Sequence, residues 1–400
     1  MITAIRHAAS LLEESVLHTP LLYSPAFSAL SGANVYLKLE NLQKTGSFKI
    51  RGAAYKIRVR YDSIGENGVV TASAGNHAQG VALAARDAGL AAKIVMPECV
   101  SLAKQEATLG YGAEVILHGQ SVADCIDAAE RIAALEGRMF IHPFDDYDII
   151  AGQGTVGLEI LEDLNNPDYV FVPVGGGGLI AGVATAMKAL CPDVHIVGVQ
   201  AAACPSAAVS CRLGERTCVD AARSIADGIT VREPGAKTFP IIRELVDTVT
   251  LVSEDQIASA MVRLLESGKV LAEGAGASPL AALLSGSIPV PEGSNVVLVV
   301  SGGNVDPLLI DRVLRQGFLW SGRIMRFTVW LDDEPGSLAR LLELITRLHA
   351  NVLDIHHARH ERGMPISVSR VKIELETRDT HHIEEIREEL CRAGYRIAVQ

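Results

Sequence analysis

One lysine in this chain stands where its side-chain amine could do nucleophilic chemistry. The segment Lys44-Thr-Gly-Ser-Phe-Lys-Ile-Arg-Gly52 places Lys49 directly before an expected helix, with the apolar ring of Phe48 beside it. A lysine amine forms a Schiff base with a carbonyl compound once desolvation or a neighbouring cation lowers its pKa. A solvated lysine at a helix start has the same local sequence, so Lys49 is a candidate that needs partners.

Two further segments lie at expected strand-to-helix turns and could bind anions. Thr71-Ala-Ser-Ala-Gly-Asn-His-Ala-Gln-Gly80 offers free N–H groups at a helix N-terminus, where a carboxylate can lie against the backbone of residues 73–77 while the Asn76 amide bonds a ring oxygen. Ordinary capping by Ser73 or Asn76 explains the same residues equally well. In Val174-Gly-Gly-Gly-Gly-Leu179, four glycines let the backbone approach a phosphate closely.

The glycine run also fits part of the dinucleotide-binding fingerprint. Gly176-x-Gly178-x-x-Ala181 has its spacing, but the fingerprint needs an acidic residue about 20 positions further on to bind the ribose. The next expected strand ends at Val199-Gln200, without an acid. A single phosphate monoester is therefore favoured over a dinucleotide.

A fourth segment, Val300-Ser-Gly-Gly-Asn304, follows the last expected strand of the core. It puts the neutral hydroxyl of Ser301 at the carboxyl end of a strand, which is where ligands of α/β folds bind. By itself the segment also fits an ordinary turn.

The elements expected around these segments alternate regularly. From about 35 to 320, short β-branched runs alternate with longer amphipathic runs rich in Ala and Leu. The strand runs include 68–72, 93–96, 170–174, 195–199 and 295–300. They are almost continuously apolar, which is typical of parallel strands covered on both faces. We therefore expect an α/β fold with two parallel-sheet lobes and a cleft between them.

The pattern changes near Trp320. The remainder reads β-α-β-β-α-β, with strands at 324–331, 351–360, 366–377 and 395–399 and helices at 336–349 and 380–392. This order is typical of a ferredoxin-like domain. The sequence thus predicts two domains, 1–320 and 324–400.

Composition excludes several function classes. Lys and Arg number 36 against 47 Asp and Glu, a net charge of −11, which argues against nucleic acid or an anionic membrane as partner. The uncharged run 169–187 is nearly long enough to cross a bilayer, but Pro173 and the four glycines would leave backbone groups unsatisfied in lipid. Seven cysteines without a CxxC pair fit free thiols in a reducing compartment, so we expect a cytoplasmic protein.

In combination and in this order, the four segments resemble the fold-type II enzymes that use pyridoxal 5'-phosphate, whose fold is tryptophan synthase β-like. The likeness covers roughly 15–320 and is greatest to threonine dehydratases (threonine ammonia-lyases) and their serine dehydratase and serine racemase relatives. Further similarity lies in Gly152-Gln-Gly-Thr155, Ile225-Ala-Asp-Gly228 and Glu273-Gly-Ala-Gly-Ala277.

The resemblance implies a role for each segment. Lys49 would hold the cofactor aldehyde as an internal Schiff base and, once displaced by the substrate amine, would serve as the base for the α-proton. Phe48 would flank the ring, Asn76 would bond its hydroxyl and Ser301 its nitrogen. The phosphate would lie on Gly175, Gly176, Gly177, Gly178 and Leu179. The substrate would contact Ser73, Ala74, Gly75, Asn76, His77 and Gln153.

The implied reaction is loss of the β-hydroxyl and then of ammonia, which converts threonine to 2-oxobutanoate and serine to pyruvate. Two departures narrow the choice. The serine that acts as a second base in serine racemases is here Ala74, which argues against racemisation as the main activity. The two carboxylate positions of the racemase metal site are here Gln200 and Ser206, so no divalent metal is expected.

The C-terminal unit resembles an ACT domain, an amino-acid-sensing module. Its implied effector residues are Asp333, Gly336, Leu338 and Asn351, and the effector by analogy is isoleucine or valine. Because such domains work in pairs, a homodimer or homotetramer is expected. Histidines gather here, and His356 and His360 would share one strand face, but a solvated polar face is favoured over a metal site.

The leading hypothesis is a pyridoxal-phosphate lyase that deaminates L-threonine and, less well, L-serine. One alternative is a dehydratase of another β-hydroxy amino acid, either serine or 3-hydroxyaspartate. Another is a non-catalytic amino-acid sensor with a decayed core, although Lys49 is present in this chain.

Overall fold

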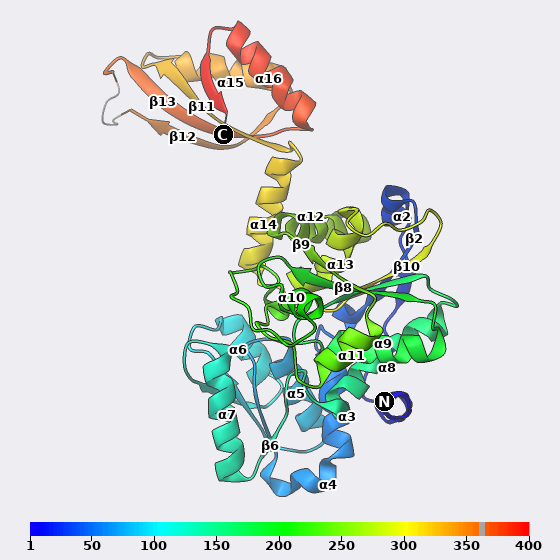
Figure 1. Cartoon of the computed structure of the whole chain (residues 1–400). Coiled ribbons are helices and arrows are strands. Elements are labelled where there is room, and N and C mark those ends of the chain that lie inside the picture. The colour runs from blue at the N-terminus through cyan, green and yellow to red at the C-terminus, as the bar shows by residue number, and fades with distance from the viewer. Residues whose placement is uncertain (360–364, 400) are drawn as a thin grey trace. The chain divides into compact units, whose positions relative to one another are not determined.

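The computed structural model describes residues 1–359 and 365–399, which form two compact units, Met1–Asp306 and Pro307–Gln400 (Figure 1). The first unit contains two lobes, each built on its own sheet. Helix α14 (Pro307–Trp320) falls in the second unit, whereas the sequence placed it at the end of the first domain. Only Val313 of α14 is buried. The apolar residues of this helix therefore do not indicate to which of the two units it belongs.

The smaller lobe has a parallel sheet in the order β5-β4-β3-β6. All four residues of β3 are buried, because helices cover both faces of the sheet. Its strands are β3 (Val69–Ala72), β4 (Ala92–Met96), β5 (Glu114–Leu117) and β6 (Met139–Phe140). Its helices include α3 (Lys49–Val59), α4 (Tyr61–Ile64), α5 (Asn76–Asp87), α6 (Leu102–Leu109) and α7 (Val122–Glu136).

The larger lobe has a sheet in the order β1-β2-β10-β7-β8-β9, in which only β1 is antiparallel to its neighbour. The strands are β1 (Leu21–Tyr23), β2 (Asn34–Leu39), β7 (Tyr169–Pro173), β8 (His195–Ala201), β9 (Thr248–Val252) and β10 (Asn295–Val300). The helices are α1 (Ile2–Leu12), α2 (Pro25–Ser31), α8 (Tyr147–Asp163), α9 (Gly178–Leu190), α10 (Ser206–Leu213), α11 (Thr238–Leu245), α12 (Glu254–Arg263) and α13 (Gly274–Leu284). These two parallel sheets confirm the predicted mixed α/β core.

Close helix packing joins the lobes. A Cβ added to Gly182 of α9 would lie 2.4 Å from the Ile150 carbonyl oxygen of α8, and one added to Gly152 of α8 would lie 2.6 Å from the Arg51 carbonyl oxygen of α3. Glycine at these positions therefore lets the backbones of α3, α8 and α9 touch. As a result, the helix that begins with Lys49 is fixed against the larger lobe.

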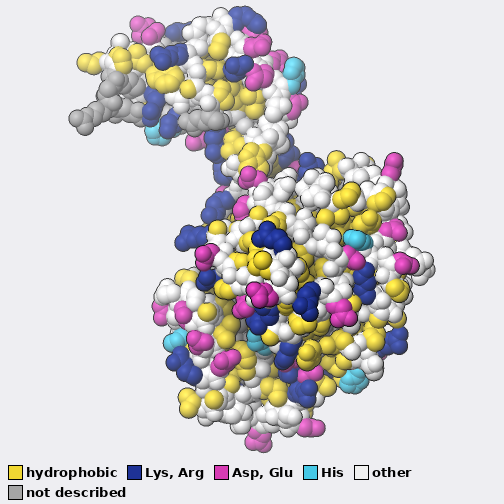
Figure 2. Space-filling view, viewed as in Figure 1, with side chains coloured by type: hydrophobic (Ala, Val, Ile, Leu, Met, Phe, Trp, Pro, Cys, Tyr) yellow, Lys and Arg dark blue, Asp and Glu magenta, His cyan; other side chains and the backbone are white. Residues whose placement is uncertain are grey.

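The uncharged run 169–187 is strand β7, the glycine loop and the start of α9. No helix among the described residues is long and apolar enough to cross a membrane. On the face seen in Figure 2, Lys and Arg side chains are interspersed with Asp and Glu side chains.

The second unit has an antiparallel sheet in the order β12-β13-β11-β14, the strand order of a ferredoxin-like βαββαβ fold. Its elements after α14 are β11 (Ile324–Asp332), α15 (Ser337–Arg347), β12 (Asn351–Ala358), β13 (Val368–Glu376), α16 (Thr380–Arg392) and β14 (Arg396–Val399). These confirm the predicted order of elements. The predicted end of the second strand, His360, lies outside the described residues.

Candidate active site

Lys49 is the first residue of α3, and its Nζ donates a hydrogen bond to the carbonyl oxygen of Pro143 at 2.9 Å. The Nζ lies 5.2 Å from the centre of the Phe48 ring. Burial lowers the pKa of Lys49 to about 8, although the Glu273 carboxylate opposes this shift. About a tenth of the amine is therefore uncharged, and nucleophilic, at pH 7, far more than at the ordinary lysine pKa of 10.5.

The loop before α3 is joined to the segment after β10. Phe48 N donates to the Ser301 carbonyl oxygen at 3.1 Å, and Gly303 N donates to the Gly46 carbonyl oxygen at 2.9 Å. The side chain of Asn304 donates to the Thr45 carbonyl oxygen at 2.7 Å. The parallel register of β2 and β10, which pairs Leu39 with Val300, brings the two segments together. The predicted motif that contains Lys49 and the one that contains Ser301 are thus hydrogen-bonded to each other.

Asn76 sits at the centre of a hydrogen-bonded group. Its Nδ2 donates to both carboxylate oxygens of Glu273, at 2.8 and 3.0 Å, and its Oδ1 accepts from Asn304 Nδ2 at 2.8 Å. These partners fix which end of the amide is the donor. Burial raises the pKa of Glu273 to about 7, although the bond from Asn76 opposes the shift. The Asn76 amide is therefore held in one orientation, with its nitrogen as the donor.

Residues 73–77 follow β3 and lead into α5. The helix has no side-chain cap, and the Ser73 hydroxyl accepts from Gly75 N at 3.2 Å instead. The first N–H groups of α5 therefore keep their capacity to bind a carboxylate. His77 is buried, with Nε2 3.1 Å from the Ile141 carbonyl oxygen, and burial lowers its pKa to about 3. Its imidazole stays neutral, so only its backbone is available to an anion.

The glycine loop joins β7 to α9, a helix of 13 residues. Gly177 has a φ of +96°, and a Cβ on Gly176 would lie 2.4 Å from the Phe144 ring. Within the described part of the chain, none of the N–H groups of 175–177 donates to another protein atom. Only glycine fits this backbone, and its free N–H groups at a helix N-terminus suit a phosphate.

The two remaining predicted residues lie on different elements. Ser301 follows β10 and is 2% exposed. Gln153 lies on α8, and its Oε1 accepts from Gly52 N in the first turn of α3 at 3.2 Å. Gln153 therefore holds the helix that begins with Lys49, and its contact with substrate stays a prediction.

A lysine amine of lowered pKa, a glycine loop that suits a phosphate and a fixed amide fit one cofactor. The fold and these groups define the class of pyridoxal-phosphate enzymes of fold type II. A family model described as pyridoxal-phosphate dependent enzyme matches residues 12–302.

Individual relatives narrow the class. An L-threonine ammonia-lyase of Thermotoga maritima is 46% identical over 395 residues, which is 99% of this chain and 98% of that protein. One of Geobacter sulfurreducens is 46% identical over 99% of this chain and 98% of its own. The solved structure of the processed form of threonine deaminase isoform 2 from Solanum lycopersicum is 35% identical, with a TM-score of 0.74 over 78% of this chain and 92% of its own. The chain therefore belongs to the pyridoxal-phosphate dependent enzyme family, among the threonine ammonia-lyases, which are lyases with pyridoxal 5'-phosphate as cofactor.

Several residues of the site escaped the sequence analysis. In the sequence, Glu273 and Asn304 stand within the motifs, but the motifs by themselves give neither residue a role. A carboxylate directly before a glycine-rich helix start was a usable signal for Glu273. The contacts made by Pro143, Phe144 and Asp145 had no such signal, because they depend on how a loop folds back onto the glycine run.

Gln200 and Ser206, which stand at the two carboxylate positions of the racemase metal site, take part in one group of hydrogen bonds. Gln200 Nε2 donates to the Val174 carbonyl oxygen at 3.2 Å and lies 3.3 Å from the Ser206 hydroxyl, which donates to the Val231 carbonyl oxygen at 2.6 Å. A neutral amide donor thus occupies the place where a cation would need charged oxygens. No group of three or more potential ligands of the His, Cys, Asp and Glu types forms a metal site among the described residues.

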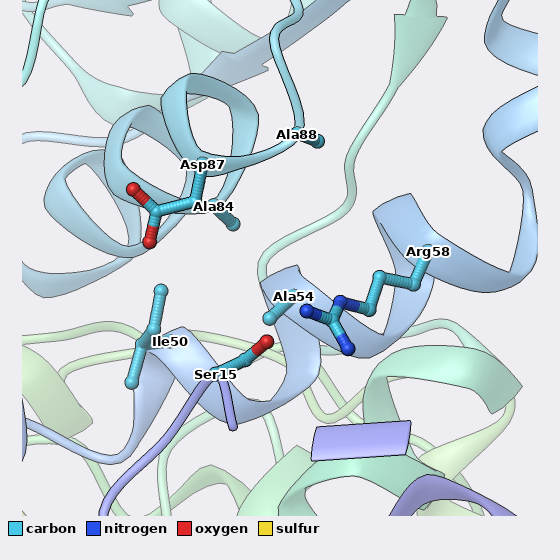
Figure 3. A pocket seen from close by; sticks show the side chains of 7 residues that line it. All are labelled: Ser15, Ile50, Ala54, Arg58, Ala84, Asp87 and Ala88. Carbon is cyan, nitrogen blue, oxygen red and sulfur yellow. The ribbon is translucent and has the colours of Figure 1, made fainter. Parts of the chain in front are cut away.

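Two cavities are lined by other residues. The one in Figure 3 is about 30 Å³ and is lined by residues of α3 and α5, among others, including Ile50 and Asp87, so it holds little more than a water molecule. The second, of about 540 Å³, lies in the C-terminal unit and is lined by Asp333, Gly336 and Leu338. Three of the four predicted effector residues therefore share one cavity.

The fourth, Asn351, does not line that cavity. It begins β12 and donates to Glu376 at 3.3 Å, whereas His357 and Arg359, which do line it, lie at or beyond the other end of the strand. At roughly 3.3 Å per residue, the length of β12 separates Asn351 from the cavity. Arg359 pairs with Asp333 at 3.1 Å, so the cavity contains both charges of an ion pair.

The pKa of Lys49 predicts how cofactor uptake depends on pH. When pyridoxal phosphate is added to the cofactor-free protein, the rate at which the visible absorbance returns should rise about tenfold for each pH unit below about 8, because only the neutral Lys49 amine attacks the aldehyde. Above pH 8 the rate should level off. Glu273→Gln should move this midpoint to lower pH, since the lost carboxylate favours the ammonium form. The exposed Glu66→Gln serves as control. A midpoint near 10.5, the ordinary lysine value, would contradict the assignment.

Proposed function

We propose that this protein converts L-threonine to 2-oxobutanoate and ammonia, with conversion of L-serine to pyruvate as a side activity. The observation that carries the proposal is the buried Lys49 amine, with its pKa of about 8, within reach of the charge of Glu273, which also fixes the Asn76 amide. The full-length likeness to proteins named L-threonine ammonia-lyase supports the choice of substrate.

Lys49 would anchor pyridoxal phosphate covalently through its amine. The glycine loop 175–179 would hold the phosphate, Phe48 would flank the ring, Asn76 would donate to its hydroxyl and Ser301 would face its nitrogen. When bound, the cofactor supplies an aldehyde for attachment and a ring that withdraws electrons from the substrate's α-carbon. A neutral serine hydroxyl does not force a proton onto the ring nitrogen, which suits prompt elimination over slow side reactions.

The substrate carboxylate would lie on the N–H groups of 73–77, at the positive end of α5. The free Lys49 amine would then take the α-proton as the β-hydroxyl leaves. Ala74 has no group that could deliver a proton from the opposite face, so racemisation is disfavoured. The released enamine tautomerises, and water replaces its nitrogen to give the 2-oxo acid and ammonia.

The alternative substrate 3-hydroxyaspartate would need a cation for its second carboxylate. Lys104 of α6 is the candidate, because it influences the pKa of Glu273, but its Nζ pairs with Asp227 at 2.8 Å. A second substrate carboxylate would have to compete with Asp227 for this lysine. We therefore favour threonine.

We further propose that the predicted domain 324–400, within the C-terminal unit, is an ACT regulatory domain that senses isoleucine or valine. The cavity beside Asp333, Gly336 and Leu338 supports this, since the Asp333–Arg359 pair offers both charges that an amino acid requires. A homodimer or homotetramer is the proposed assembly. The seven cysteines are free thiols, in keeping with the cytoplasm as the proposed location.

One assay tests substrate and effector together. We expect 2-oxo acid release with kcat/KM about tenfold or more higher for threonine than for serine, because the extra methyl group of threonine would be buried on binding. Isoleucine or valine should change the rate in the full chain but not in an Asp333→Ala variant. A higher kcat/KM for 3-hydroxyaspartate would replace the proposed substrate, and equal rates with and without both amino acids would remove the proposed effectors.

A further inference from the structure

The loop between β6 and α8 carries a carboxylate that binds backbone rather than substrate. Asp145 Oδ1 accepts from Lys237 N at 2.7 Å and from Thr238 N at 3.3 Å, and its Oδ2 accepts from Ala236 N at 3.0 Å. These N–H groups lie at the start of α11, whose own N-cap residue, Lys237, provides no side-chain capping hydrogen bond. Asp145 therefore caps a helix that lies 91 to 93 residues further along the chain.

The turn that Asp145 holds also binds the glycine loop. Thr238 Oγ1 donates to the Gly176 carbonyl oxygen at 2.6 Å, and Gly235 N donates to the same oxygen at 3.2 Å. In a planar trans peptide the N–H points opposite to the carbonyl. Fixing the Gly176 carbonyl toward the turn therefore aims the Gly177 N–H away from it. This orientation leaves that N–H free for an anion.

Residues next to Asp145 brace the same loop. A Cβ on Gly176 would lie 2.4 Å from the Phe144 ring, and one on Gly178 would lie 3.1 Å from Phe144 Cβ. His142 Nδ1 accepts from Asp145 N at 2.8 Å and from Phe144 N at 3.2 Å. The segment 142–145 is thus held by its own hydrogen bonds. It contacts the glycine loop directly through Phe144 and is linked to it through the turn at 235–238.

We propose that Asp145 is a positioning residue for the cofactor phosphate, acting through the turn at 235–238 and the Gly176 carbonyl. The inference rests on the proposed role of the glycine loop in binding that phosphate. A carboxylate near a phosphate site would ordinarily repel the phosphate. Here its charge is directed at the positive end of α11 and at three N–H groups, so it organises the loop without facing the anion.

The test compares ligands with and without the phosphate. Full-length, cofactor-free protein of the wild type and of Asp145→Ala is dialysed to equilibrium against pyridoxal phosphate and, separately, against pyridoxal, and the bound ligand is measured by absorbance. The variant should bind pyridoxal phosphate about tenfold to a hundredfold more weakly, the range typical of hydrogen bonds to a charged group. Its affinity for pyridoxal should change less than about twofold, because pyridoxal does not use the phosphate loop.

Asp145→Asn should fall between the two proteins because it keeps one acceptor oxygen, and it carries the test if the alanine variant does not fold. Asp124→Ala is the matched control, since Asp124 also accepts two backbone N–H bonds, from Gln120 and Ser121, on another loop. Equal losses for both ligands would mean that Asp145 only stabilises the fold, which overturns the inference.

The variant Gly176→Ala distinguishes the proposed role of Asp145 from the proposed role of the glycine loop in binding the phosphate. If Gly176→Ala loses the preference for the phosphorylated ligand and Asp145→Ala keeps it, Asp145 is not a positioning residue but the glycine loop still binds phosphate. If neither variant changes the preference, the assignment of the loop itself fails.

Discussion

Replacing Lys49 with alanine should reduce 2-oxo acid release from L-threonine by on the order of 10⁴-fold, the upper range for loss of a general base. The same substitution removes the covalent anchor of the cofactor. The fold should survive, because the structure gives the Lys49 amine one hydrogen bond, to Pro143, and burial already disfavours its charged form. Activity is followed by 2-oxo acid release and the anchor by mass mapping after borohydride reduction.

Lys44→Ala is the matched control for this experiment. Lys44 lies in the same segment and is exposed, and its Nζ donates to the Glu14 carbonyl oxygen at 3.2 Å. It should keep wild-type activity and cofactor content. A borohydride label on any other lysine, or undiminished activity of Lys49→Ala, would overturn the proposed mechanism. A wild-type protein with neither label nor 2-oxo acid release would favour the non-catalytic sensor.

Arg51→Met should destabilise the first unit by about 3–5 kcal/mol, the usual cost of leaving buried charges without their partner. Arg51 is fully buried two residues after Lys49, and its guanidinium bonds Glu40 at 2.8 Å and Glu159 at 2.5 Å. Lys38 also pairs with Glu159, at 2.6 Å. These two cations and two anions balance, and the substitution would leave two carboxylates with one cation.

The measurement is urea denaturation at neutral pH, with Arg60→Met as control. Arg60 is the residue after α3, pairs with Asp148 and is half exposed, so its loss should cost less than about 1 kcal/mol. Burial opposes ionisation of Glu159, but Arg51 and Lys38 hold the pKa of Glu159 below its ordinary 4.5. This contribution is therefore present at neutral pH and is lost as the pH falls through the lowered pKa. Equal midpoints for the two variants would refute the prediction.

The sequence by itself determined the α/β core, the order of elements in the C-terminal unit and the segments at the ends of the strands. It could do so because each of these follows from local residue types. A buried parallel strand needs a continuous apolar run, and a phosphate loop at a helix start needs glycine. Lys49 was recognisable for the same reason, together with the order of the four motifs.

Only the tertiary structure decided which side chains meet. Asn76 bonds Glu273 across 197 residues and Asn304 across 228, and no periodicity encodes such partners. The pKa values of Lys49 and Glu273 follow from burial between the two lobes, which no single segment contains. The same reason explains why Asn351 does not line the predicted effector cavity: resemblance aligns positions along the chain, whereas the length of a strand sets their separation in space.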